Sequence, residues 1–201
     1  MDRFRQRLQH LEHPVTSVLD VGAYRGEFAR LAHQLFPGAR IKCIEGDERQ
    51  APFLQAFNTD FYLLGKETKQ VDFYTLPEES CTTGSSIYRE NTIYYTNPVV
   101  LKKWMYAIDD LNFPSFDLIK LDVQGAELDI LKGGKKYFKQ TRPRYLLLET
   151  SVQQYNHGAP LAGSVISYLD KKGYYLRDII DNIYDRNNQL LQVDFLFECN
   201  A

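Results

Sequence analysis

The sequence predicts an α/β protein in which a mostly parallel sheet carries helices on both faces. Short apolar runs alternate with amphipathic stretches along most of its 201 residues, and this alternation is typical of β-α-β units with right-handed crossovers. A chain of this length fits one hydrophobic core, and its 44% of hydrophobic and 25% of charged residues are ordinary globular values. We therefore expect a single domain over residues 1–201.

The first half of the chain follows the alternation closely. A polar helix over 2–11 ends before Pro14, and the apolar run 16–21 leads into glycine, as buried parallel strands do. The next helix, 26–36, has one apolar face and stops at Pro37-Gly38. A strand at 40–44, a helix to residue 57 and a third strand at 61–64 follow.

The alternation lapses between residues 66 and 107, where short β-like runs surround a loop rich in Ser and Thr at 81–86. We expect a β-rich insertion there. Beyond it, the pattern predicts helices at 126–138 and 161–172 and strands at 116–121, 145–148, 174–180 and 192–198. Only a short polar link joins the last two of these seven strands, so they should be antiparallel.

Composition and charge narrow the function classes. A net charge of -2 gives no reason to expect a nucleic acid or an anionic membrane as partner. The three cysteines, Cys43, Cys81 and Cys199, form neither a disulfide framework nor a metal-binding spacing. The N-terminal segment is charged, and no run of about 18 apolar residues occurs. We expect a cytoplasmic protein with no membrane span, and a homodimer stays open.

Polar groups and glycines follow the first two strands. The turn Asp20-Val21-Gly22-Ala23-Tyr24-Arg25-Gly26 lets the backbone approach a ligand, and the next helix presents free N–H groups to it. Glu45 ends the next strand, where a carboxylate can accept hydrogen bonds from both hydroxyls of a ribose. Asp47 is the more natural helix cap. This arrangement predicts a nucleoside ligand.

Asp20 favours one kind of nucleoside. A carboxylate at the end of the first strand would repel a diphosphate but suits a cationic group. S-adenosylmethionine carries an amino group and a ribose with both hydroxyls free, so it fits better than a nicotinamide dinucleotide.

The fourth strand leads into the segment Ile119–Gly134, which places Asp122, Gln124 and Glu127 near its carboxyl end, where open α/β sheets bind ligands. Glu127 is explained equally well by support of a helix N-terminus. His157 follows the fifth strand in a polar loop. Asp122 with Glu149 could hold a hard cation, but carboxylates from different strands more often meet by coincidence, and we expect no metal.

The segment IKLDVQGAELDILKGG resembles the signature of the FkbM-type methyltransferase family. LDVGAYRGEF, CIEGD, AIDDL, LLLETSVQQY and QVDFLFE agree in the same order, so the resemblance covers roughly residues 17–198. It implies a Rossmann-like methyltransferase fold with the antiparallel last strand inserted between neighbours, S-adenosylmethionine as cofactor, and O-methylation of sugar or polyketide hydroxyls. Tyr24-Arg25 stands where the family commonly has Asn and a small residue.

Site residues follow from the turn, the strand ends and the resemblance together. The cofactor-binding set is Asp20, Gly22, Ala23, Gly26, Glu45, Gly46, Asp122 and Gln124. Methyl transfer from a sulfonium needs positioning above all, and either Asp122 or His157 would orient or deprotonate the accepting hydroxyl.

The acceptor is expected to be a small molecule, a glycan or a polyketide, recognised by the insertion 66–107. Its aromatic residues suit sugar rings or flat ligands, or else form the core of a small β-layer: Phe73, Tyr74, Tyr88, Tyr94, Tyr95, Trp104 and Tyr106. The competing functions are an NAD-dependent oxidoreductase, a non-catalytic nucleoside-binding module of the same fold, and methyl transfer to nitrogen or carbon.

Overall fold

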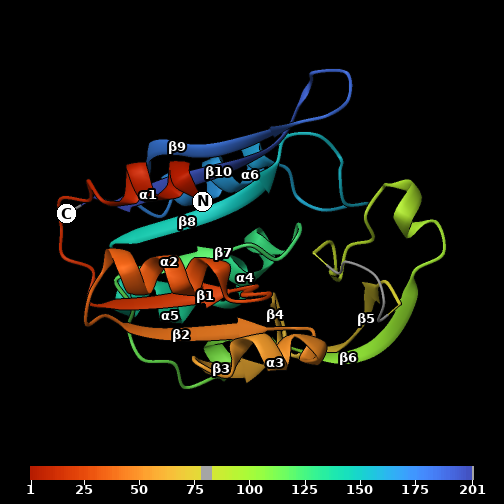
Figure 1. Cartoon of the computed structure of the whole chain (residues 1–201), viewed down its shortest axis with the longest axis horizontal. Coiled ribbons are helices and arrows are strands. Elements are labelled where there is room, and N and C mark those ends of the chain that lie inside the picture. Colours follow the sequence, from red (N-terminus) through yellow and green to blue (C-terminus); the bar gives the residue numbers. More distant parts are fainter. Residues whose placement is uncertain (78–82, 201) are drawn as a thin grey trace.

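A seven-stranded sheet lies between two layers of helices in the computed structural model, which describes residues 1–77 and 83–200 (Figure 1). Across the sheet the strands are β3 (Asn58–Phe61), β2 (Arg40–Glu45), β1 (Ser17–Val21), β7 (Leu118–Leu121), β8 (Tyr145–Ser151), β10 (Leu190–Cys199) and β9 (Tyr174–Tyr184). The first five are parallel, and β10 is antiparallel to both β8 and β9. The prediction of an inserted antiparallel last strand is confirmed.

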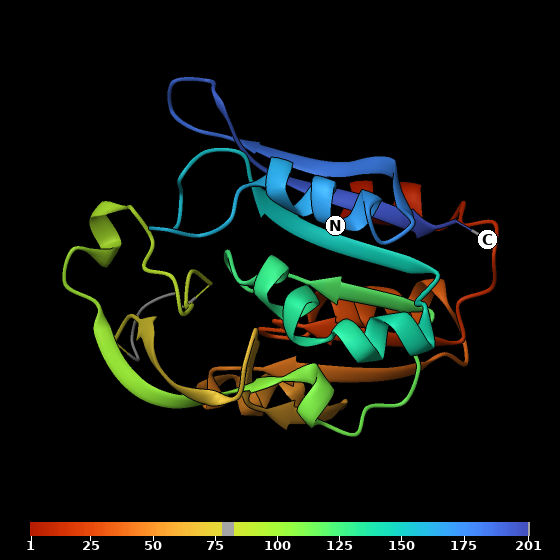
Figure 2. The same cartoon turned by 180° about the vertical axis from the view of Figure 1, so that it is seen from behind.

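Helices cover both faces of this sheet. On one face lie α1 (Asp2–Leu8), α2 (Glu27–Leu35) and the short α3 (Ala51–Leu54), and on the other, seen from behind in Figure 2, lie α4 (Glu127–Gly133), α5 (Lys135–Thr141) and α6 (Ala162–Asp170). Successive side chains of a strand point to opposite faces. Val18 therefore packs with α1 and α2, whereas Leu19 packs in the core that contains α4 and α6. No helix of the described residues is long and apolar enough to cross a membrane.

A second, three-stranded sheet stands beside the first. It consists of β4 (Leu63–Gly65), β6 (Val99–Ala107) and β5 (Lys69–Thr75), with β6 in the middle. Phe73 and Tyr95 are buried in this region, while Tyr94 and Trp104 are exposed. Some of the predicted aromatic residues are thus core of a small β-layer. Part of the predicted Ser/Thr loop, residues 81–82, lies outside the described residues.

The predicted third strand at 61–64 is wrong. Asn58–Phe61 pairs with β2 as the edge of the large sheet, and Leu63 and Leu64 begin the pairing of β4 with β6 in the small one. An edge strand is only half-buried, so the polar sequence Asn58-Thr59-Asp60 gives no apolar run. The apolar run belongs to β4, whose residues are all buried.

The helix predicted over 126–138 is divided in two, and the helix predicted to reach residue 57 ends at Leu54. The division falls at Gly133-Gly134. A Cβ atom on Gly133 would lie 2.0 Å from the carbonyl oxygen of Gly65, so this glycine lets α4 pack directly against β4. A contact between segments so far apart in sequence cannot be read from local periodicity.

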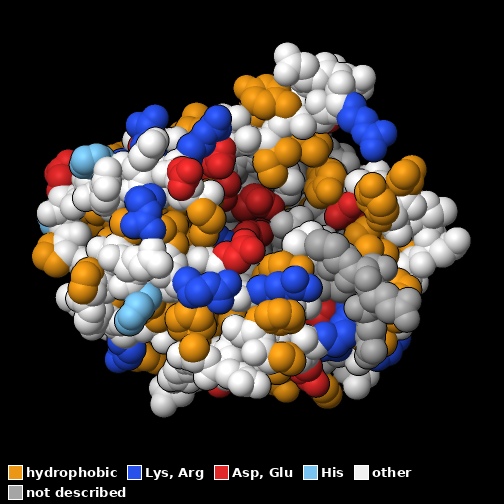
Figure 3. All heavy atoms as spheres, viewed as in Figure 1, with side chains coloured by type: hydrophobic (Ala, Val, Ile, Leu, Met, Phe, Trp, Pro, Cys, Tyr) orange, Lys and Arg blue, Asp and Glu red, His pale blue; other side chains and the backbone are white. Residues whose placement is uncertain are grey.

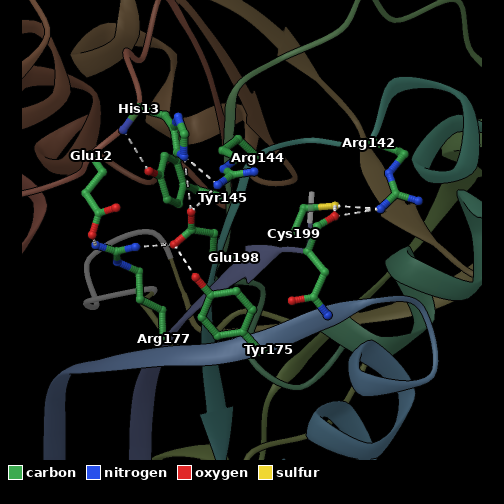
Figure 4. Close-up of polar contacts among 10 residues, drawn as sticks. Glu12, His13, Arg142, Arg144, Tyr145, Tyr175, Arg177, Glu198 and Cys199 are labelled. Atoms are coloured by element: carbon green, nitrogen blue, oxygen red, sulfur yellow. Dashed lines mark hydrogen bonds and ion pairs between the residues drawn. The ribbon is translucent and has the colours of Figure 1, made fainter.

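A buried carboxylate fastens the sheet at the end away from the carboxyl ends of the parallel strands (Figure 4). Glu198 on β10 is 1% exposed and accepts hydrogen bonds from Arg177 and from Tyr175, the latter at 2.7 Å. Arg144 forms an ion pair with it at 2.6 Å. Burial opposes ionisation, but the bonds from Tyr175 and Arg177 outweigh it and lower the pKa of Glu198. These contacts hold β8, β9 and β10 together.

The close approach of α4 to β4 gives a testable prediction. Gly133→Ala places a methyl group against the Gly65 carbonyl and should lower the free energy of unfolding by about 1–3 kcal/mol, because backbone must shift to admit it. Gly163→Ala in α6 is the matched control, since nothing lies within 4 Å of its Cβ position. It should raise stability by about 0.5–1 kcal/mol. Urea unfolding measures both, and equal effects would contradict the packing.

Candidate active site

A cavity of about 330 Å³ opens where the carboxyl ends of β1, β2, β7 and β8 face the small sheet. The turn after β1, the end of β2, the residues after β7, Thr83 and residues 85–87 line it, together with Glu149 and Asp194. Acidic side chains gather in a hollow near the middle of this face in Figure 3. The cavity therefore lies where ligands of open α/β sheets bind.

The turn after β1 is shaped by close approach to β7. Gly22 has φ +79, and a Cβ atom there would lie 1.8 Å from the backbone oxygen of Asp122, so no other residue fits without a shift of the backbone. The N–H groups of Gly22 and Ala23 donate to the carbonyl of Ile44, which ties the turn to β2. Gly26, with φ +76, is the N-cap of α2 and does not line the cavity. Arg25 stacks 4.4 Å from the ring centroid of Phe53.

Glu45 connects the turn after β1 to the end of β2 through two hydrogen bonds. Its Oε2 accepts a hydrogen bond from the Tyr24 N–H at 2.7 Å, and its Oε1 accepts one from the Asp47 N–H at 2.8 Å. Burial raises the pKa of Glu45 to about 7, although these backbone N–H groups oppose the rise. Each oxygen keeps a lone pair for a ligand hydroxyl. Asp47 caps the short helix that follows, as the sequence indicates.

A buried lysine, which the sequence analysis missed, stands among the carboxylates. Lys120 pairs with Asp20 across β1 and β7, and its Nζ donates to Asp122 Oδ2 at 2.7 Å. Burial alone would lower the pKa of Lys120, but the charges of Asp122 and Asp20 outweigh burial and raise it. Asp20 is fully buried, and neither of its oxygens has a hydrogen-bond partner among the described residues. Burial raises the pKa of Asp20 to about 6, against the opposing charge of Lys120.

Two amides and a second carboxylate extend this cluster across β8 and β10. Gln124 donates to Asp122 Oδ1 at 3.1 Å and to Glu149 Oε1 at 2.7 Å, and Gln192 donates to the same Glu149 oxygen at 2.9 Å. Asp194 stands opposite Glu149 in the antiparallel ladder. Burial and the charge of Asp122 together raise the pKa of Asp194 to about 7, against the opposing charge of Lys120.

Glu127, which follows β7, and His157, which follows β8, both lie outside the lining of the cavity. Glu127 Oε1 accepts the N–H groups of Val123 at 3.0 Å and Gly125 at 3.1 Å, so it closes the turn after β7 and does not line the cavity. His157 is exposed and lines a separate pocket with Tyr74, Ile87 and Arg89. The structure thus does not bring His157 to Asp122.

Seven of the eight residues predicted to bind the cofactor line one cavity: Asp20, Gly22, Ala23, Glu45, Gly46, Asp122 and Gln124. Sequence reasoning missed Lys120, Gln192 and Asp194, and considered Glu149 only as a metal ligand. These residues could have been found in the sequence, because each is a charged or amide residue inside an otherwise apolar strand. Within residues 1–77 and 83–200, no group of three or more His, Cys, Asp or Glu side chains is arranged to hold a metal ion.

Comparison with known proteins matches residues 20–176 to the methyltransferase FkbM domain. The 2-O-methyltransferase NoeI of Sinorhizobium fredii is 28% identical over 211 residues, which cover 92% of this chain and 85% of that protein. The FkbM methyltransferase structure from Methylobacillus flagellatus has a TM-score of 0.60 at 18% identity and covers 94% of this chain. This chain spans less than half, 46%, of that one.

More distant solved structures share the fold. Magnesium protoporphyrin IX methyltransferase from Synechocystis PCC 6803, solved with bound SAM, has a TM-score of 0.51 at 11% identity, over 93% of this chain and 71% of that one. At this identity the likeness concerns the fold, and it confirms the Rossmann-like methyltransferase architecture.

The raised pKa of Asp194 predicts how stability depends on pH. Below a pH of about 4 this carboxyl is protonated in the folded and unfolded states alike. As the pH rises to about 7, the unfolded chain ionises first, so stability is lost. Asp194→Asn removes this loss. Its unfolding free energy should fall less than that of the wild type between about pH 5 and 7, by roughly 1–3 kcal/mol.

Chemical denaturation at a series of pH values measures this difference. Asp170→Asn, at the exposed end of α6, is the control and should follow the wild type. Parallel pH curves for Asp194→Asn and wild type would show that Asp194 ionises normally.

Proposed function

Because this chain belongs to the FkbM methyltransferase family, we propose that its cavity binds S-adenosylmethionine and that the protein methylates a hydroxyl oxygen of a small acceptor. One observation carries the proposal: Asp20 near the end of β1 and Glu45 at the end of the neighbouring strand β2 line the same cavity. The family match supports a methyltransferase over the alternative of an NAD-dependent oxidoreductase.

The cavity offers partners for two polar parts of the cofactor, its ribose and its amino group. Glu45, with a free lone pair on each oxygen, is placed to accept hydrogen bonds from the ribose hydroxyls. Asp20 is a buried carboxylate without a hydrogen-bond partner in the described chain, and a cationic amino group would supply one. Gly22, Ala23 and Gly46 offer backbone close to the ligand, and Asp122 and Gln124 close the other side.

The protein contributes mainly by positioning. S-adenosylmethionine supplies a methyl group on a positively charged sulfur. The described part of the chain holds the reacting partners in a walled cavity, which reduces the entropy that must be lost on the way to the transition state. Asp122, fixed by Lys120 and Gln124, is a proposed orienting group at the cavity floor.

A hydroxyl acceptor is supported by the relative NoeI, whose name describes a 2-O-methyltransferase. The carboxylates and the Gln124 amide on the cavity wall suit a polyhydroxylated ligand such as a sugar, because they can accept or donate several hydrogen bonds. We propose that residues 66–107 cover the acceptor site, since Ser85, Ser86 and Ile87 line the cavity. A cytoplasmic location and a homodimer stay predictions.

Glu45 tests the cofactor site. Glu45→Ala removes hydrogen bonds from a charged acceptor, which are worth about 1.5–3 kcal/mol, so the Kd for S-adenosylhomocysteine should rise about ten- to a hundred-fold. Glu48→Ala, an exposed neighbour, should bind as the wild type does. Calorimetric titration measures both, and an unchanged Kd in a folded Glu45→Ala protein would remove Glu45 from the site.

Ile87 tests the acceptor segment. Ile87→Ala removes apolar wall from the cavity and should raise the KM for the acceptor about ten-fold or more, while the Kd for S-adenosylhomocysteine stays within a few-fold. Tyr94→Ala is the control, because Tyr94 is exposed and does not line the cavity. If Ile87→Ala weakens cofactor binding and acceptor binding equally, the segment does not specifically recognise the acceptor.

A further inference from the structure

We propose that Glu149 is the general base that removes the proton from the accepting hydroxyl; this inference rests on the proposed function. Glu149 lines the same cavity as the cofactor residues, near the carboxyl end of β8. The sequence predicts Asp122 or His157 for this role, and the geometry favours neither.

Asp122 and His157 are poorly placed to receive a proton. Asp122 is engaged at both oxygens, since Oδ2 pairs with Lys120 at 2.7 Å and Oδ1 accepts from Gln124 at 3.1 Å. His157 lies in another pocket, beyond Ile87, which contributes to the walls of both. A general base must reach within hydrogen-bond distance of the proton it takes.

Glu149 is held rigidly at one oxygen and free at the other. Gln124, from the turn after β7, and Gln192, from β10, both donate to Oε1, at 2.7 and 2.9 Å. No described residue donates a hydrogen bond to Oε2, so Oε2 remains available to a ligand in the cavity. Two amides from different elements fix the direction of the carboxylate before the acceptor arrives, which is the preorganisation that proton transfer requires.

The surroundings also make Glu149 a stronger base than an ordinary glutamate. Burial raises its pKa, the charges of Asp122 and Asp194 raise it further, and Lys120 opposes them. Glu127 adds a smaller repulsion, and the phenol of Tyr155 lies within electrostatic reach. A base whose pKa is nearer neutrality takes a proton more effectively at neutral pH.

The step balances in atoms and charge. The acceptor oxygen forms a bond to the methyl carbon while the carbon–sulfur bond breaks, and that electron pair stays on sulfur, which becomes a neutral thioether. The hydroxyl proton passes to Oε2 of Glu149 and later to solvent, so the product is a neutral methyl ether.

Glu149→Gln tests the proposal, because the glutamine keeps an oxygen for Gln124 and Gln192 but has almost no basicity. Transfer is measured with a radiolabelled methyl donor and a panel of methyl glycosides of common hexoses and pentoses. We expect kcat to fall about 10²–10⁴-fold, with the acceptor KM and the Kd for S-adenosylhomocysteine within a few-fold of wild type. The acidic limb of the pH–rate profile should disappear.

Two comparison variants and one spectroscopic readout sharpen the test. Glu12→Gln, exposed at the opposite end of the sheet, should retain wild-type kinetics. Asp194→Asn should retain the acidic limb; if it loses that limb while Glu149→Gln keeps it, Asp194 is the base and the proposal fails. In the wild type with S-adenosylhomocysteine bound, the carbon-13 signal of the Glu149 carboxyl should titrate at higher pH than it does in the urea-unfolded protein.

The possible results distinguish the role of Glu149 from the proposed methyltransferase function. Wild-type transfer with an unchanged kcat in Glu149→Gln overturns the role of Glu149 and leaves the proposed function intact. A Glu149 carboxyl that titrates at the same pH in the folded and unfolded protein also overturns it. Failure of the wild type to bind S-adenosylhomocysteine or to methylate any member of the panel overturns the proposed function, and this inference with it.

Discussion

The ion pair between Lys120 and Asp122 is the interaction on which the site depends. Burying an unpaired charge costs several kcal/mol even after relaxation, and here Asp20, Asp194 and Glu149 lie near the same ammonium. Lys120 partly offsets their mutual repulsion, which allows carboxylates to line a cavity inside an α/β sheet. Burial raises the pKa values of Asp20 and Asp194, and the charge of Lys120 only partly offsets this rise. Buried carboxyl groups with raised pKa values can bind a cationic ligand or accept a proton.

The inserted antiparallel strand supplies what the parallel strands cannot. Because β10 runs against β8, its beginning lies beside the end of β8, so Asp194 lines the cavity from the opposite direction and Gln192 donates a hydrogen bond to Glu149. Its far end carries Glu198, which Arg144 and Arg177 fasten. One strand therefore joins a structural ion network at one end of the sheet to a polar cavity at the other. The edge strand β9, paired along β10, keeps that strand in the interior.

The sequence predicted those features that depend on local pattern. The apolar run into Gly22, the acid at Glu45 and the cap at Asp47 are set by residues within one or two elements, and the structure has each of them where the pattern indicates. The contacts of Lys120, Glu149 and Asp194 depend on which strands are neighbours, so only the strand order reveals them. The division of the predicted helix at Gly133 and the pairing of Leu63 in the small sheet have the same cause. Each depends on a contact with residues distant in sequence.

The central claim is that these strand ends form an S-adenosylmethionine site. Calorimetric titration of the wild-type protein with S-adenosylhomocysteine, and separately with NAD⁺, tests it most directly. We expect one S-adenosylhomocysteine bound per chain, and no measurable heat from NAD⁺, whose diphosphate Asp20 and Asp122 would repel. Binding of NAD⁺ without binding of S-adenosylhomocysteine would contradict it.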